Sequence, residues 1–215
     1  MLNQEEFTIN ERSERVLQPY NIKTNLKPHQ LAMICAMKNL EESKFIELKD
    51  SCSNIDKCFQ TSVGCLCDKV GSGKSLTTLG LIATIPKRIN KKKVSYQYGL
   101  ITTYRFYKNY LPINLLVVPH NIVKQWEGYI NENTDLEYLL INNKKSFEKF
   151  IELFTKCLSE DLNVSYFDQD LLLVSNTFYN KITDLINNPG YLNIAYEIYR
   201  NIIISRLIVD EVDTI

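Results

Sequence analysis

The chain has 215 residues, 45% of them hydrophobic, so it can bury one substantial core as a single globular domain. Its 25 basic residues balance 25 acidic ones, which excludes a strong whole-molecule field directed at a polyanionic partner. No apolar run approaches the roughly 20 residues that span a bilayer, and the polar start at residues 3–6 is no secretory signal, so we expect a soluble intracellular protein without a membrane partner.

The first predicted helix begins near Pro28, because proline suits an opening helical turn, and continues to about Leu40. Residues 47–62 are polar and predict a loop. The apolar run Val63 to Cys67 then predicts a short buried strand, and Leu76 to Ile85 predicts an apolar helix face.

Between this predicted strand and helix lies a glycine turn, Gly71-Ser72-Gly73-Lys74-Ser75. Two glycines let the backbone curl so that successive N–H groups point at phosphate oxygens, and a helix that opens at Lys74 adds its positive dipole end. Lys74 can then reach the β- and γ-phosphates, and the Ser75 hydroxyl can ligate Mg²⁺. Asp68 stands where the generic pattern has its first glycine, and a flexible surface turn is the alternative interpretation.

Residues 86–110 carry seven basic side chains and no acidic one, interleaved with aromatic residues. Lysines that follow a phosphate backbone and tyrosines that stack on bases would form a surface for single-stranded nucleic acid. The alternative is a solvated insertion whose tyrosines cover the flank of the sheet.

The rest of the chain alternates short apolar runs with helical patterns, which predicts an α/β fold with a mostly parallel sheet. Three of the expected strands are Leu115–Val118, Leu136–Ile141 and Leu171–Ser175. The expected helices are residues 121–131, 146–158, 177–187 and 191–203.

A last apolar run, Leu207 to Val209, ends abruptly at Asp210 and Glu211. Ligands of open parallel sheets sit outside the carboxyl ends of the strands, so we expect Asp210 to meet a magnesium ion held by Ser75. Glu211 would orient the attacking water. This places residues 71–75 beside residues 210–211, although Asp-Glu pairs are also common on solvated loops.

Taken together and in order, the motifs resemble the N-terminal RecA-like lobe of superfamily 2 helicases and SNF2-type translocases, and most closely the viral helicases of large DNA viruses. Asp68 to Ser75 looks like motif I, in which the first glycine is often replaced. Leu26 to Gln30 resembles the adenine-reading segment, which implies that Gln30 contacts the base of ATP; an exposed glutamine at a helix start is the alternative. Residues 210–213 look like motif II, which implies that Asp210 supports Mg²⁺ and Glu211 activates water.

The segment 115–126 looks like motif Ia, which approaches the nucleic-acid backbone in the family. The resemblance therefore implies contacts from Pro119, His120 and Gln125, although His120 departs from the small hydroxyl residue usual at its position. Trp126, the only tryptophan, is interpreted as helix packing in preference to a base-stacking platform.

Residues 172–177 resemble the next strand-to-helix turn of the family. There Ser175 and Thr177 could donate to a phosphate near a helix N-terminus. Plain helix caps would have the same sequence.

The resemblance implies an N-terminal extension over residues 1–25 and an incomplete helicase lobe over residues 26–215, with a basic, tyrosine-rich insertion at about 86–110. Helices would cover both faces of the RecA-like P-loop sheet, which is truncated after motif II. The implied partners are DNA or RNA and a second RecA-like lobe, and the implied location, for a viral protein, is the host cytoplasm or the virion.

The implied activity is ATP hydrolysis of the helicase type in the full-length protein. We expect the isolated chain to bind ATP and Mg²⁺, to hydrolyse ATP poorly and to be of low stability. The alternatives are a catalytically idle nucleotide-binding or structural fragment and a small-molecule P-loop kinase.

Overall fold

The structure, a computed structural model, describes residues 9–43, 45–48, 57–60, 63–84, 92–98, 101–107, 110–159, 168–187 and 203–211. The chain divides into two compact units. The phosphate-loop unit comprises residues 1–85 and 129–135, and the sheet unit comprises residues 86–128 and 136–215.

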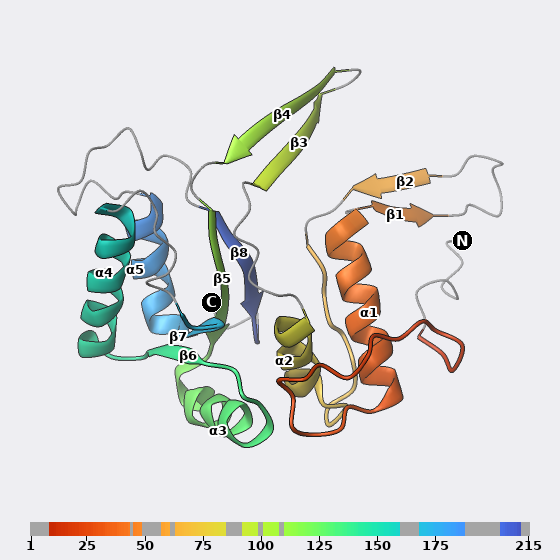
Figure 1. The fold of residues 1–215 in the computed structure, drawn as a ribbon, viewed down its shortest axis with the longest axis horizontal. Coiled ribbons are helices and arrows are strands. Elements are labelled where there is room, and N and C mark those ends of the chain that lie inside the picture. Colours follow the sequence, from red (N-terminus) through yellow and green to blue (C-terminus); the bar gives the residue numbers. More distant parts are fainter. Residues whose placement is uncertain are drawn as a thin grey trace. The chain divides into compact units, whose positions relative to one another are not determined.

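Four parallel strands form the main sheet of the sheet unit, in the order β6-β7-β5-β8 (Figure 1). They are β5 (Tyr110–Val118), β6 (Tyr138–Ile141), β7 (Leu171–Ser175) and β8 (Ile203–Val209). The mostly parallel α/β sheet predicted from the sequence is therefore confirmed. The expected helix at 191–203 falls mostly outside the described residues, and its last residue, Ile203, belongs to β8 instead.

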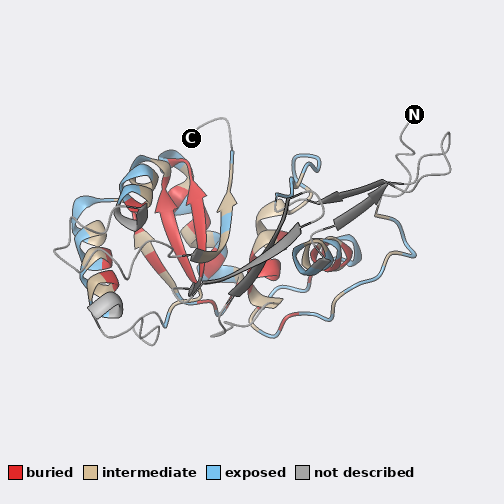
Figure 2. Ribbon diagram, turned by 90° about the horizontal axis from the view of Figure 1, so that it is seen from above, coloured by how far each residue is buried: buried red, intermediate tan, exposed pale blue. Residues whose placement is uncertain are grey.

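The central strands are buried on both faces (Figure 2). Alternate residues of β5 and β7 face one cluster, which includes Leu115, Val117, Leu172 and Val174. Their neighbours Leu116 and Leu173 point to the other face and are also inaccessible to solvent. Continuous apolar runs of this kind are typical of parallel strands covered on both sides.

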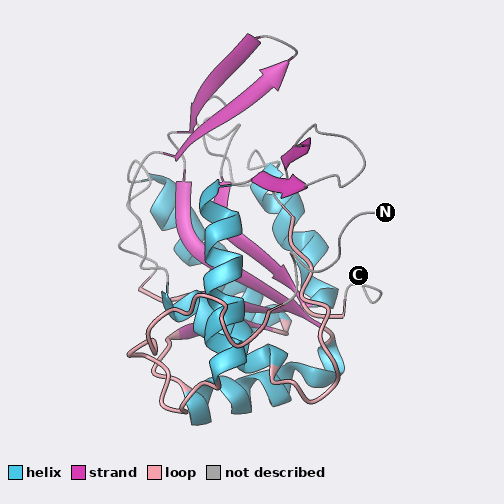
Figure 3. Ribbon diagram, turned by 90° about the vertical axis from the view of Figure 1, so that its right-hand side faces the viewer, coloured by secondary structure: helices cyan, strands magenta, loops and turns pink. Residues whose placement is uncertain are grey.

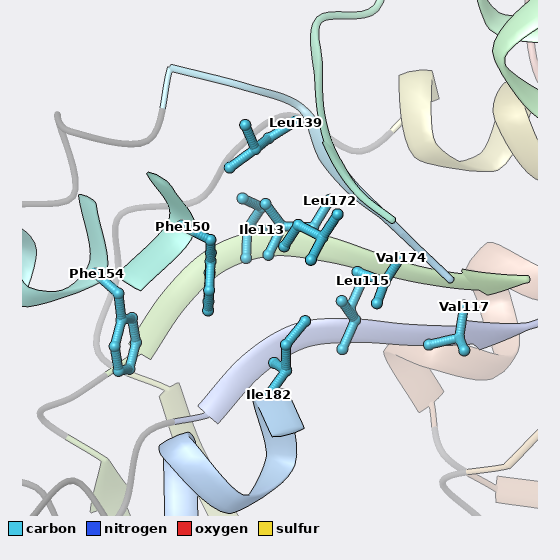
Figure 4. Packing of buried hydrophobic residues seen from close by; sticks show 10 residues of the cluster. Ile113, Leu115, Val117, Leu139, Phe150, Phe154, Leu172, Val174 and Ile182 are labelled. Atoms are coloured by element: carbon cyan, nitrogen blue, oxygen red, sulfur yellow. The ribbon is translucent and has the colours of Figure 1, made fainter. Parts of the chain in front are cut away.

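Two helices cover one face of this sheet, α4 (Lys144–Ser159) and α5 (Asn176–Asn187). Phe150 and Phe154 of α4 and Ile182 of α5 meet the strand side chains in this cluster (Figure 4). Helix α4 begins where it does because Asn143 and Ser146 cap it reciprocally: each backbone N–H donates to the other's side-chain oxygen.

Helix α3 (Val123–Asn133) follows β5 through a short 3₁₀ turn, η2 (His120–Ile122). In the strand order β6-β7-β5-β8, the connection from β5 to β6 runs toward the β6 edge of the sheet. The connections from β6 to β7 and from β7 to β8, which contain α4 and α5, run toward the β8 edge. Because such crossovers are right-handed, α3 leaves β5 on the opposite face. Helices α3, α4 and α5 confirm the predicted ranges to within two residues at each end; α3 is displaced by two residues at both ends relative to the expected 121–131.

The basic segment 86–110 contains an antiparallel hairpin that the sequence reading did not foresee. Its strands are β3 (Lys92–Tyr98) and β4 (Ile101–Tyr107), visible as a separate pair in Figure 3. Both strands are rich in β-branched and aromatic residues, which favour strands, so this signal was present and was outweighed by the interpretation of the segment as a basic insertion.

The phosphate-loop unit is built on helices α1 (Pro28–Ser43) and α2 (Lys74–Thr84), which confirms both predicted helices. The helices pack closely at Gly80, where an added Cβ would lie 2.5 Å from Ile34 Cδ1. The same unit holds an antiparallel pair, β1 (Phe45–Leu48) and β2 (Lys57–Gln60). The prediction of a loop throughout 47–62 is therefore wrong at 47–48 and 57–60, and the rest of that range lies outside the described residues.

The predicted strand at Val63–Cys67 is also wrong, because these residues form no strand. Val63 is 73% exposed, and Cys65 and Cys67 are exposed as well. A strand needs a neighbouring strand for its backbone hydrogen bonds. None of the strands in the described ranges pairs with this segment.

Within the described ranges, no helix has the length and hydrophobicity that a membrane crossing requires.

Candidate functional sites

The glycine turn of the phosphate-loop unit has the backbone geometry of an anion cradle. Gly71 and Gly73 adopt left-handed φ angles of 82° and 85°, and α2 begins at the next residue, Lys74. The carbonyl of Gly73 accepts hydrogen bonds from the backbone N–H and the hydroxyl of Thr77, at 3.0 and 3.1 Å, and so starts the helix. Alternating handedness ahead of a helix N-terminus turns backbone N–H groups toward one point, where an anion can bind.

The ammonium group of Lys74 lies over this turn. Its Nζ donates to the backbone carbonyls of Asp68 and Lys69, at 2.8 and 3.0 Å. Ser75, half-buried, follows it in the first turn of α2. An ammonium, a hydroxyl and converging backbone N–H groups are the donor set that suits a magnesium-bound polyphosphate, so these residues fit the implied cofactor.

Asp68 occupies the position of the missing first glycine, at the exposed rim of the turn. The backbone N–H of Lys69 donates to its Oδ1 at 2.7 Å. This bond, together with the nearby Ser72 hydroxyl, holds the pKa of the Asp68 carboxyl below its usual value. Electrostatic interactions with Lys74 and His29 act in the same direction, so Asp68 is ionised at neutral pH.

Gln30 reaches the same turn from 43 positions away in the sequence. It is 4% exposed; its Oε1 accepts from the Lys27 N–H at 2.9 Å, and its Nε2 donates to the Gly73 carbonyl at 3.2 Å. The structure thus brings Gln30 and the predicted phosphate turn together. Its reading of adenine stays a prediction.

No role for His29 was predicted from the sequence. Its Nε2 lies 3.3 Å from the Ser72 carbonyl, so two consecutive residues at the start of α1 hold the turn. No local sequence signal indicates this contact, because His29 and Ser72 lie 43 positions apart.

The acidic pair lies in the sheet unit, directly after β8. The Asp210 N–H donates to the Val117 carbonyl at 3.0 Å, which extends the pairing of β8 with β5 by one residue. Asp210 Oδ2 accepts a hydrogen bond of 2.8 Å from the indole Nε1 of Trp126. Trp126 is 3% exposed, so it packs in the interior and offers no surface for base stacking.

Glu211 is exposed and has a φ of 54°. Left-handed backbone at a residue other than glycine is strained, and such strain is found preferentially at functional sites. The last residues that resemble motif II, 212 and 213, lie outside the described residues.

The predicted nucleic-acid residues gather where β5 and β7 end. Val118 and Ser175 are register partners in the parallel pair, so the turns that follow them are adjacent. The His120 N–H donates to Asn176 Oδ1 at 3.2 Å, and its Nδ1 lies 3.1 Å from Ser175 Oγ.

Ser175 Oγ also lies 2.9 Å from Thr177 Oγ1, so the serine hydroxyl links the two turns. Ser175 is fully buried and Pro119 is buried, whereas His120 and Thr177 are exposed. Gln125 lies on the exposed side of α3. Four of the five predicted residues are thus brought together, and two of these four face solvent.

No group of three or more His, Cys, Asp or Glu side chains suited to a metal is found in the part of the chain that the structure describes. The predicted metal ligands Ser75 and Asp210 belong to different units, and their joint role stays a prediction.

Comparison with known proteins agrees with the fold. The family model of the SNF2-related domain matches residues 29–215. A protein of Acanthamoeba polyphaga mimivirus with the name "Putative helicase R592" is 33% identical over 172 residues, which are 68% of this chain and 20% of that protein. The chain thus spans about one fifth of the length of this relative. The family model covers most of the chain and the parallel sheet agrees with it, so the chain belongs to the SNF2-related domain family.

Proposed function

We propose that this chain is the ATP-binding lobe of a nucleic-acid-dependent ATPase, a helicase or duplex translocase of viral origin. The observation that carries the proposal is the glycine turn at the start of α2, with two left-handed glycines and the Lys74 ammonium folded over it. Gln30 beside this turn supports ATP over other triphosphates. The similarity to a mimivirus protein supports the viral origin.

Each part of the nucleotide has a proposed partner. The backbone N–H groups of residues 71–73 hold the phosphate oxygens, and Lys74 neutralises the β- and γ-phosphates. The Ser75 hydroxyl and the Asp210 carboxylate hold Mg²⁺, which when bound neutralises charge that develops on the phosphates. Gln30 contacts the adenine base.

Glu211 is proposed to orient the attacking water and to accept its proton. Phosphoryl transfer depends on positioning and on cations around the developing charge. A second RecA-like lobe, proposed from the family resemblance, would supply the arginine finger, which is typically worth a factor of about 10³ to 10⁵ in rate. This lobe alone would therefore bind ATP and hydrolyse it slowly.

The nucleic-acid backbone is proposed to run over the ends of β5 and β7. Exposed His120 and Thr177 and the exposed Gln125 would contact phosphates. Pro119 and Ser175 are buried, so they would act by shaping the turns that present these three side chains. The basic segment 86–110 offers a second surface for the same nucleic-acid strand.

The first test is removal of the lysine charge. Lys74→Ala should weaken ATP binding by about 10- to 100-fold or more, because a charge-assisted contact to phosphate is lost. Isothermal titration with Mg²⁺ present measures the affinity. Lys69→Ala, which removes an exposed charge in the same turn, is the control and should keep nearly the parent affinity. Equal losses in the two variants would show that only net charge matters.

The second test concerns hydrolysis in the natural full-length protein with nucleic acid present. Glu211→Gln should keep ATP affinity and lower turnover by about 10²- to 10⁴-fold, since the general base is lost. Glu148→Gln, the same change on the exposed side of α4, is the control. Hydrolysis at the parent rate in Glu211→Gln would refute the role of Glu211.

The same assay separates the alternative functions. A parent protein that binds ATP without turnover would be a catalytically idle fragment. Transfer of the γ-phosphate to a small acceptor would identify a kinase.

A further inference from the structure

The proposed magnesium carboxylate is held by a tryptophan 84 positions away. Trp126 Nε1 lies 2.8 Å from Asp210 Oδ2, and the ring is 3% exposed. The Asp210 backbone is fixed at the same time by its bond to the Val117 carbonyl at 3.0 Å. The carboxylate is thus anchored at both its main chain and one of its oxygens.

The two side chains of this pair have complementary hydrogen-bonding capacities. Indole offers a single N–H donor and no acceptor, and a buried indole N–H needs an acceptor. A carboxylate is a strong acceptor, because its charge shortens and strengthens the hydrogen bond. The bond uses Oδ2 and fixes the side-chain rotation of Asp210; among the described residues Oδ1 has no hydrogen-bond partner.

Helix α3 also carries Gln125, a residue of the proposed nucleic-acid surface. Gln125, the neighbour of Trp126, is exposed, and the turn with His120 leads directly into the helix. Consecutive residues of a helix point about 100° apart, so one helix presents one side chain to solvent and the next to the interior. A contact that moves α3 would therefore move the indole that holds Asp210.

We propose that Trp126 is a positioning residue that aims the Asp210 carboxylate at magnesium and transmits nucleic-acid contacts on α3 to it. This inference rests on the proposed function, because it takes Asp210 as a magnesium ligand. Carboxylates that bind metals are themselves commonly hydrogen-bonded, and loss of such a partner typically lowers metal affinity or activity by about 10- to 100-fold.

The first experiment tests the hydrogen bond without any nucleotide. Because Trp126 is the only tryptophan, the ¹⁵N-labelled chain gives one indole N–H resonance. Asp210→Ala should shift this resonance upfield and speed its exchange with water, whereas Glu211→Gln should leave it in place. An unchanged resonance in Asp210→Ala would overturn the inference at its first step.

The second experiment measures how much Mg²⁺ tightens ATP binding, as the ratio of affinities with Mg²⁺ and with EDTA. Trp126→Phe should lower this ratio by about 10- to 100-fold and leave the affinity in EDTA unchanged. Replacement of Trp126 by β-(3-benzothienyl)alanine, which keeps the ring size and lacks the N–H, should do the same with less loss of packing. Val123→Ala, a buried change on the same helix, is the packing control and should keep the parent ratio.

The outcomes distinguish the two proposals. If Asp210→Ala keeps the parent ratio, the magnesium role of Asp210 fails and the proposed function with it. If Asp210→Ala lowers the Mg²⁺-to-EDTA affinity ratio while both Trp126 replacements keep the parent value, the positioning role fails and the proposed function stands. If Trp126→Phe and Val123→Ala lower this ratio equally, Trp126 contributes only packing and the positioning role is refuted.

The transmission step has its own readout. Addition of a single-stranded oligonucleotide should shift the indole resonance of the parent chain, although the buried ring cannot touch the oligonucleotide. Gln125→Ala should weaken this shift. Oligonucleotide binding that leaves the indole resonance unmoved would overturn the transmission step.

Discussion

Gly73 is constrained in two ways. Its φ of 85° is unfavourable for any residue with a side chain, and an added Cβ would lie 2.5 Å from Gln30 Nε2. Gly71 has nearly the same backbone conformation, with a φ of 82°, but nothing lies within 4 Å of its added Cβ. Substitutions at these two positions therefore distinguish the cost of backbone strain from the cost of a collision with Gln30.

We predict that Gly71→Ala destabilises the chain by about 1–2 kcal/mol, the cost of left-handed backbone with a Cβ. Gly73→Ala should cost clearly more, because Gln30 must also move. Urea unfolding measures both. Adding Gln30→Ala should recover part of the Gly73→Ala loss and none of the Gly71→Ala loss. Equal losses of unfolding free energy in the two alanine variants would show that Gln30 moves aside at no measurable cost.

The sequence located the residues of the phosphate turn because their spacing is local: glycines, lysine and serine act within five consecutive positions. Contacts made across the fold could not be located in this way. The bond from Trp126 to Asp210 joins residues 84 positions apart and depends on β5 and β8 being neighbours. The burial of Ser175 likewise depends on the register of β5 with β7.

At the level of elements, β7 was predicted with its observed ends because a continuous apolar run stops at a helix-capping sequence. The run at Val63–Cys67 is similarly apolar, yet it forms no strand. Hydrophobicity records a tendency to be buried, whereas strand formation also requires a partner strand, which no single segment specifies. The β3–β4 hairpin is a different case, because its β-branched and aromatic residues favour strands and each strand has a pairing partner, yet the basic side chains led to its interpretation as an insertion.

A polar connection joins three elements at the amino-terminal side of the sheet. Asn114 of β5 is 8% exposed; its Nδ2 donates to the Asp170 carbonyl at 2.9 Å, just before β7. Its Oδ1 accepts from Arg206 Nη1 of β8 at 2.7 Å. One amide side chain thus ties β5 to both of its neighbours.

We predict that Asn114→Ala destabilises the sheet unit by about 1–3 kcal/mol, because a buried amide that makes two hydrogen bonds is removed and its half-buried partners each lose one. Arg206→Ala should cost less, since Arg206 is only half-buried. In a double-mutant cycle followed by urea unfolding, the double variant should cost less than the sum of the single variants. Strict additivity would show that the Asn114–Arg206 bond contributes nothing measurable.

For the whole molecule, stability should depend strongly on the aromatic side chains that α4 places against the sheet. Phe150 is 1% exposed and stacks on Phe154 at a centroid distance of 5.6 Å, whereas Phe147, on the same helix, is only half-buried. Phe150→Ala should therefore destabilise the chain by about 3–5 kcal/mol, from lost burial and the cavity that remains.

That loss is a large part of the roughly 5–15 kcal/mol that stabilises a typical domain. Phe150→Ala should consequently be partly unfolded at 37 °C, with lost amide protection throughout β5 and β7 in hydrogen exchange. Phe147→Ala is the matched control and should cost clearly less, because less apolar surface is lost. If the two variants unfold at the same urea concentration, the cluster of Figure 4 is not the main source of stability for the parallel sheet.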